Sequence, residues 1–337
     1  MYSDEDLDSA VKAGVLSTES VASFRAFTAR SQVSFGADEE HFRLLTGFND
    51  IFVSIAASLI LGAVGWLVGS IAHPLGGAAV SVCSWGLAEY FTRRRRMALP
   101  SILLLLTFVG GAFQAGFASI DAANGGGRIA VSAALATGAA LLHWWRFRVP
   151  ITVAAGVLAA IVMALALFVG DVPGANNLLW PLLLASGLIV FALGLRWDMS
   201  DRNRTTRRSD VAFWLHLAAA PLIVHPTFEM LGVMRGGLLA APEANLTSAG
   251  IVLVIYAGLA FIAVVIDRRA LLVSGLSYVL YAMTALLRAV GSLSVSLALP
   301  ALLIGSALLL LSVYWRPARK LVVGLLPSSV RDRLPVA

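Results

Sequence analysis

Two histidines lie inside an apolar stretch, "AFWLHLAAAPLIVHP" (residues 212–226), that also contains Pro221 and Pro226. On a straight helix, the nine-residue separation of His216 and His225 corresponds to about 180° of rotation and about 13.5 Å of rise. Their imidazole rings would therefore face opposite ways, and only a large kink at the prolines would bring them to one metal ion or haem. We accordingly expect no metal and no other cofactor.

A second group of polar residues is expected near the opposite, non-cytoplasmic end of the apolar stretches. Glu229 follows His225 by four residues, on the same helical face. Gln114 and Arg288 occur at similar depths in two other stretches, so the four side chains could form one polar cluster. Such a cluster inside a membrane is typical of a solute or proton site. The alternative, which we favour, is that all four extend to the same membrane boundary.

His216 lies about 9 Å into its stretch by helical rise, near the cytoplasmic end. Asp50 and Glu89 are the acidic residues considered as its partners, although no spacing selects either. Asp50 also suits the start of a helix, where the dipole stabilises a negative charge. Glu89 precedes Arg93 by four residues, the spacing of a helical ion pair. His143, in "LLHWWRFR", is expected in an interfacial aromatic belt.

The composition places most of these residues in a membrane. Of 337 residues, 59% are hydrophobic and only 13% are charged, whereas a soluble domain carries roughly 25% charged residues. The net charge of +6 comes from short basic clusters between apolar runs, which is a membrane pattern and does not suggest nucleic acid. With Cys83 as the one cysteine, an intramolecular disulfide is excluded.

Ten apolar stretches are long enough to be membrane helices. They span residues 51–72, 75–92, 98–120, 128–145, 150–170, 178–196, 210–233, 248–267, 270–288 and 293–315. Sixteen basic residues follow the even-numbered stretches, against three in the opposite loops, Arg128, Arg235 and Arg288. Positively charged loops stay in the cytoplasm, so the pattern predicts five hairpins with both termini inside. The GxxxG pairs Gly65/Gly69 and Gly232/Gly236 predict close helix packing.

Polar segments flank this all-α, polytopic helix bundle, so we divide the chain into residues 1–48, 49–315 and 316–337. The first segment is acidic and predicts two short helices, with Gly14 ending one and Ser17 capping the next. Val21 and Phe24 would share the apolar face of the second. The last segment places basic residues beside leucines and predicts an amphipathic helix on the membrane surface.

One stretch of the first segment, "AVKAGVLSTESVASFRAF" (residues 10–27), carries a resemblance to a known family. It resembles the cytoplasmic N-terminal module of the domain-of-unknown-function 2157 family, predicted bacterial membrane proteins. The resemblance implies a pair of short helices followed by membrane hairpins in a bacterial inner membrane. It implies no reaction.

Three classes of function remain after these observations. The first is a non-catalytic membrane component (a sensor, scaffold or assembly factor) that binds a protein partner through residues 1–48. The second is a secondary transporter of a small solute, similar in plan to the ten-helix drug/metabolite transporters. Matched helix interruptions in the two halves of the chain would point to a transport site. Prolines interrupt the seventh stretch but not the second, and this mismatch weakens the transporter hypothesis. The third is a membrane-embedded transferase. In all three classes the protein contacts the lipid bilayer. The sequence does not indicate an oligomeric state.

Overall fold

The structure is a computed structural model that describes residues 7, 10–24, 48–120, 125–171, 174–201, 206–231, 246–269, 271–272, 276, 279–280, 283, 298–331 and 334. Every regular element within these residues is a helix. The chain divides into two compact units, Met1–Arg43 and Leu44–Ala337, which are described separately below.

The first unit contains helical turns at residues 10–12 and 18–24. Gly14 lies between them with a φ of +70°, a conformation that glycine adopts without steric cost. The hydroxyl of Ser17 accepts a hydrogen bond of 3.0 Å from the Ser20 N–H, which confirms the predicted cap. Val21 is buried, whereas Phe24, expected on the same face, is half exposed.

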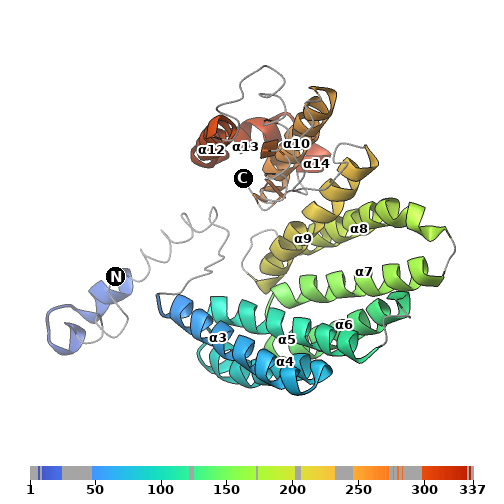
Figure 1. Cartoon of the computed structure of the whole chain (residues 1–337). Helices are drawn as coiled ribbons and strands as arrows, with labels where there is room; N and C mark the ends of the chain where they lie inside the picture. Colours follow the sequence, from blue (N-terminus) through green and yellow to red (C-terminus); the bar gives the residue numbers. More distant parts are fainter. Residues whose placement is uncertain are drawn as a thin grey trace. The chain divides into compact units, whose positions relative to one another are not determined.

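The second unit begins with three helices that pack on one another, α3 (Phe48–Ile71), α4 (His73–Ala88) and α5 (Ala98–Ser119) (Figure 1). A π-helical turn, η1 (Glu89–Arg94), extends α4 before the chain reverses. Glycines bring α3 and α4 close together, since a Cβ on Gly65 would lie 2.9 Å from the Cγ2 of Val80. This contact supports the predicted packing role of Gly65, while Gly232 and Gly236 lie outside the described residues.

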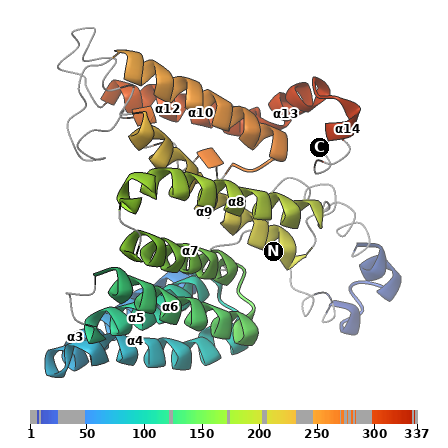
Figure 2. The same cartoon turned by 90° about the vertical axis from the view of Figure 1, so that its right-hand side faces the viewer.

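The middle of the unit consists of α6 (Gly125–Phe147), α7 (Ile151–Asp171), α8 (Leu179–Met199) and α9 (Arg207–Met230), with a 3-10 turn, η3 (Ala175–Leu178), before α8. α6 packs on α5 and α7, and α9 packs along α8 and against α7 (Figure 2). α9 remains helical through Pro221 and Pro226. Its apolar segment is 56% buried, against 11–33% in the other four long apolar helices, so its side chains mainly face protein.

The last described helices are α10 (Leu246–Ile266), α12 (Ala298–Val313), α13 (Trp315–Gly324) and α14 (Ser328–Arg331). α13 packs against α10 and α12. It buries Trp315, Arg319 and Val323 on one side and exposes Leu321 and Leu325 on the other. The tail is thus helical where its sequence predicts an amphipathic helix, and its place on a membrane surface stays a prediction.

Five helices of the described chain are long and apolar enough to cross a membrane: α3, α5, α7, α8 and α9. They identify the chain as a helical membrane protein. The second and fourth expected spans form α4 and α6, which are rich in alanine and glycine and are not among these five. Of the expected span 270–288, only scattered residues are described.

Candidate functional site

A buried cluster of charged side chains joins α8, α9 and the end of α10. Asp198 accepts two hydrogen bonds from the guanidinium of Arg268, one of them from Nε at 3.2 Å and the other from Nη2. The Nε2 atom of His216 lies 2.9 Å from Oδ2 of the same carboxylate. Arg268 also donates to the carbonyl and hydroxyl of Ser209, at 3.1 and 3.3 Å. The aspartate thereby bridges a guanidinium and an imidazole.

The backbone at the end of α10 positions Arg268. Asp267 adopts a φ of 58°, and the Arg268 N–H donates to the carbonyl of Ala263 at 2.8 Å, which closes the helix in a Schellman-like turn. The indole N–H of Trp315 donates to the Asp267 carboxylate at 2.7 Å and holds this turn against α13. The Arg268 side chain is thus directed towards α8 and α9 and away from the solvent.

The imidazole of His216 fills the space left by a glycine on the facing helix. A Cβ on Gly194 would lie 2.9 Å from Cε1 of the ring, so no larger residue fits there without movement. Phe191 packs edge-on against the ring, with centroids 5.1 Å apart. Within the described chain, the Nδ1 atom is buried without a hydrogen-bond partner. Because a carboxylate accepts hydrogen bonds, Nε2 is the ring atom that donates to Asp198.

This cluster corrects two expectations from the sequence. His216 pairs with Asp198, and not with Asp50 or Glu89. Arg268, one of the sixteen basic residues assigned to cytoplasmic loops, is 1% exposed. Asp198 was overlooked because α8 continues three residues beyond the expected end at residue 196, which had left Asp198 in the loop.

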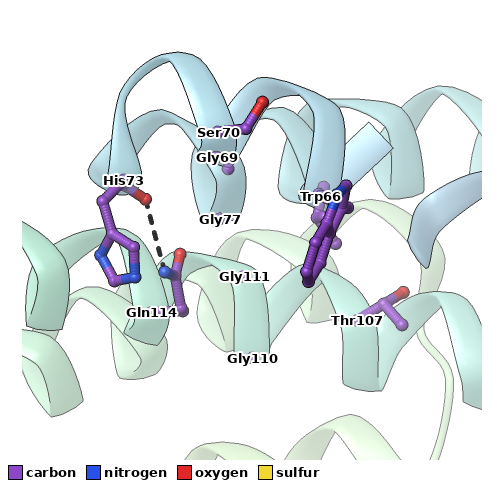
Figure 3. Close-up of a pocket in the computed structure, with 12 residues that line it drawn as sticks. Trp66, Gly69, Ser70, His73, Gly77, Thr107, Gly110, Gly111 and Gln114 are labelled. Carbon is purple, nitrogen blue, oxygen red and sulfur yellow. Dashed lines mark hydrogen bonds between the residues drawn. The ribbon is translucent and has the colours of Figure 1, made fainter. Parts of the chain in front are cut away.

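A groove between α3, α4 and α5 contains another of the predicted residues, Gln114 (Figure 3). Its volume is about 540 Å³. Glycines of all three helices line it, and Trp66, Thr107 and His73 contribute larger side chains. The Gln114 amide nitrogen lies 3.5 Å from the His73 carbonyl, and its buried oxygen has no partner among the described residues.

The other predicted site residues lie elsewhere. His225 contacts Trp180 of α8, with ring centroids 5.3 Å apart, and Glu229 lies one turn further along α9. Arg288 is outside the described residues. Asp50 is buried in the first turn of α3. The hydrogen bond of Gln114 is with the start of α4, so the four-residue polar cluster remains a prediction.

Glu89 forms a second interhelical ion pair. It receives two hydrogen bonds from Arg146 of α6, at 2.7 and 2.9 Å, and one from Arg93 at 3.2 Å. The pair with Arg93 confirms the prediction from spacing, whereas the pair with Arg146 was missed. His143, one turn earlier in α6, is fully buried, with Nδ1 3.2 Å from the hydroxyl of Thr152. The interfacial aromatic belt stays a prediction.

We expect Arg146→Gln to lower the unfolding temperature of the detergent-solubilised protein more than Arg93→Gln does. The Arg146 pair is bidentate and its side chain is 29% exposed, against 56% for Arg93. Exposed i,i+4 pairs contribute little because water screens them. Circular dichroism during heating measures both shifts, and equal shifts would contradict the expectation.

These features define a class, a helical polytopic membrane protein with a buried ion pair between Asp198 and Arg268. No group of three His, Cys, Asp or Glu side chains suited to a metal ion occurs within the described ranges. Comparison with protein-family models, with curated proteins and with solved structures finds no match.

Proposed function

We propose that the protein is a non-catalytic, multi-pass component of a bacterial inner membrane: a sensor, scaffold or assembly factor. In this proposal ten helices cross the bilayer and both termini are cytoplasmic. Sixteen basic residues follow the even-numbered stretches, against three in the opposite loops. Arg268 and Arg319 are buried, and the remaining fourteen against three support this orientation.

The observation that carries the proposal is the closure of the Asp198–His216–Arg268 cluster. The three residues are at most 5% exposed, and their polar groups bond to one another. A general base must come within hydrogen-bond reach of the proton it removes. A cluster that is closed to solvent is therefore better suited to holding helices together than to catalysis.

The N-terminal unit supports a role in binding a protein. Val15, Leu16 and Phe24 are 74%, 39% and 50% exposed, although this unit is otherwise short and polar. Exposed apolar side chains of this kind would be covered when the unit binds a protein partner. We therefore assign the partner-binding role to residues 1–48.

A transporter is the second candidate, and the groove between α3, α4 and α5 favours it. A transport site needs a cavity with a few polar groups, and Gln114, Thr107 and His73 provide them. The two candidates differ in what fills the groove. A solute pathway is filled with water, whereas a groove in a scaffold faces lipid.

Thiol labelling distinguishes these candidates, because Cys83 is the chain's one cysteine and can be replaced by alanine. Gly110→Cys places a thiol in the groove, at a position with nothing within 4 Å of a Cβ. Arg95→Cys is the control, on the exposed turn after η1. Inside-out membrane vesicles and right-side-out vesicles are treated with a membrane-impermeant maleimide, before and after denaturation.

We expect the groove thiol of the Gly110→Cys variant to stay unlabelled in both kinds of native vesicle and to react after denaturation, because a thiol in lipid does not ionise to the reactive thiolate. The control thiol should react in inside-out vesicles alone. Rapid labelling of the groove thiol in native vesicles would instead favour the transporter. Labelling of the control only in right-side-out vesicles would overturn the proposed orientation.

A further inference from the structure

An apolar slot lies where α12 meets α13. Its volume is about 150 Å³, and its walls are four leucines, Leu272, Leu276, Leu308 and Leu311. Trp315 and Ser312 also line it, and among the described residues of the lining Arg269 is the one that is charged. A narrow apolar slot with a single cation suits a molecule that combines a hydrocarbon chain with an anionic group.

Arg269 is available to bind such an anion. Its side chain is exposed, and its guanidinium carbon lies 4.9 Å from the centre of the Trp315 ring. Among the described residues it has no carboxylate partner. The nearby Asp267 carboxylate is already bound by the Trp315 indole, 2.7 Å away, and faces Arg319 at 3.9 Å. The ring contact uses none of the guanidinium N–H donors, so they are available to an anion.

The surroundings of the slot place it where lipid is present. Leu309 and Leu310 of α12 are 71% and 60% exposed, as expected for side chains in contact with acyl chains. α13 continues from this point as an amphipathic helix that exposes Lys320 beside Leu321. A helix of this kind lies at the level of the headgroups, where basic residues attract anionic lipids.

From these observations we infer that the α12–α13 corner binds one anionic phospholipid. The phosphate pairs with the Arg269 guanidinium, and the beginning of one acyl chain enters the slot between the leucines. The indole of Trp315 serves as the surface on which the guanidinium is held. This inference does not depend on whether the protein is a scaffold or a transporter.

The test is native mass spectrometry of the full-length protein in detergent, equilibrated with equal amounts of phosphatidylglycerol and phosphatidylcholine. We expect the protein to retain phosphatidylglycerol preferentially. Arg269→Gln should lower this retention about fivefold, the ratio that one basic residue contributes at an anionic surface. Arg95→Gln is the matched control, because Arg95 is also exposed and its guanidinium carbon lies 5.6 Å from the centre of an aromatic ring, that of Tyr90, outside the slot.

Leu308→Trp tests the apolar half of the site, because the larger side chain would fill the slot while Arg269 is kept. We expect it to reduce phosphatidylglycerol retention and expect soluble glycerol phosphate not to compete. Equal losses in Arg269→Gln and Arg95→Gln would overturn the inference in favour of general charge attraction. Competition by glycerol phosphate, or full retention in Leu308→Trp, would show that no acyl chain occupies the slot.

Discussion

Replacing Arg268 with methionine is expected to destabilise the folded protein by about 3–5 kcal/mol, the usual cost of removing one partner of a buried ion pair. The Asp198 carboxylate would keep its contact with His216 but lose the guanidinium that neutralises it. Ser209 would lose its bonds as well. The measurement is the temperature at which the detergent-solubilised protein loses its monodisperse peak in size-exclusion chromatography.

A second substitution separates charge from packing. An asparagine at position 198 can still accept a hydrogen bond from His216 but carries no charge. The double variant Asp198→Asn, Arg268→Met should therefore recover most of the stability, since replacing a whole buried pair is often nearly neutral. Arg95→Met, on an exposed turn, serves as the control. If the double variant is as unstable as Arg268→Met, the lost stability comes from missing side-chain packing and not from an unpaired charge.

The second large effect is expected at the contact between α4 and α5. A Cβ on Gly77 would lie 2.5 Å from the carbonyl oxygen of Gly111 and 2.8 Å from the backbone nitrogen of Ala115. Backbone atoms cannot move aside as flexible side chains do, so Gly77→Ala must separate the two helices. Overpacking of this kind costs about 1–3 kcal/mol, and we expect a loss at the upper end of that range.

Gly110→Ala is the matched control for Gly77→Ala. Gly110 belongs to α5 and lines the same groove, but a Cβ there meets nothing within 4 Å. The fraction of each variant that remains folded in increasing concentrations of sodium dodecyl sulfate gives the comparison. If the two alanine variants unfold at the same detergent concentration, α4 and α5 do not pack as closely at Gly77 as described.

Local features of the fold could be predicted because they depend on a few neighbouring residues. Gly14 and Ser17 end and start helical turns as expected, and Glu89 pairs with Arg93 because i and i+4 share a helical face. Long apolar runs likewise indicate α3, α5, α7, α8 and α9. In each case the interacting groups lie within one turn or one helix.

The buried cluster could not be predicted, because its members are far apart in the sequence. Asp198 and Arg268 are 70 residues apart, and both lie where a span was expected to have ended. Hydropathy assigns residues beyond the end of a span to a loop. Because positively charged loops stay in the cytoplasm, Arg268 was then counted as evidence for the orientation of the chain in the membrane. Only the packing of α8 against α9, and the turn after Ile266, bring these residues together.

The close contact between the His216 ring and Gly194 makes these two positions dependent on each other in evolution. A lineage that gains any side chain at position 194 must first lose or move the imidazole, because the ring occupies the space of the missing Cβ. Conversely, a lineage that replaces His216 with a small residue leaves a void that a larger residue at position 194 would fill. Substitutions at the two sites should therefore arise together in related sequences, with glycine paired to histidine.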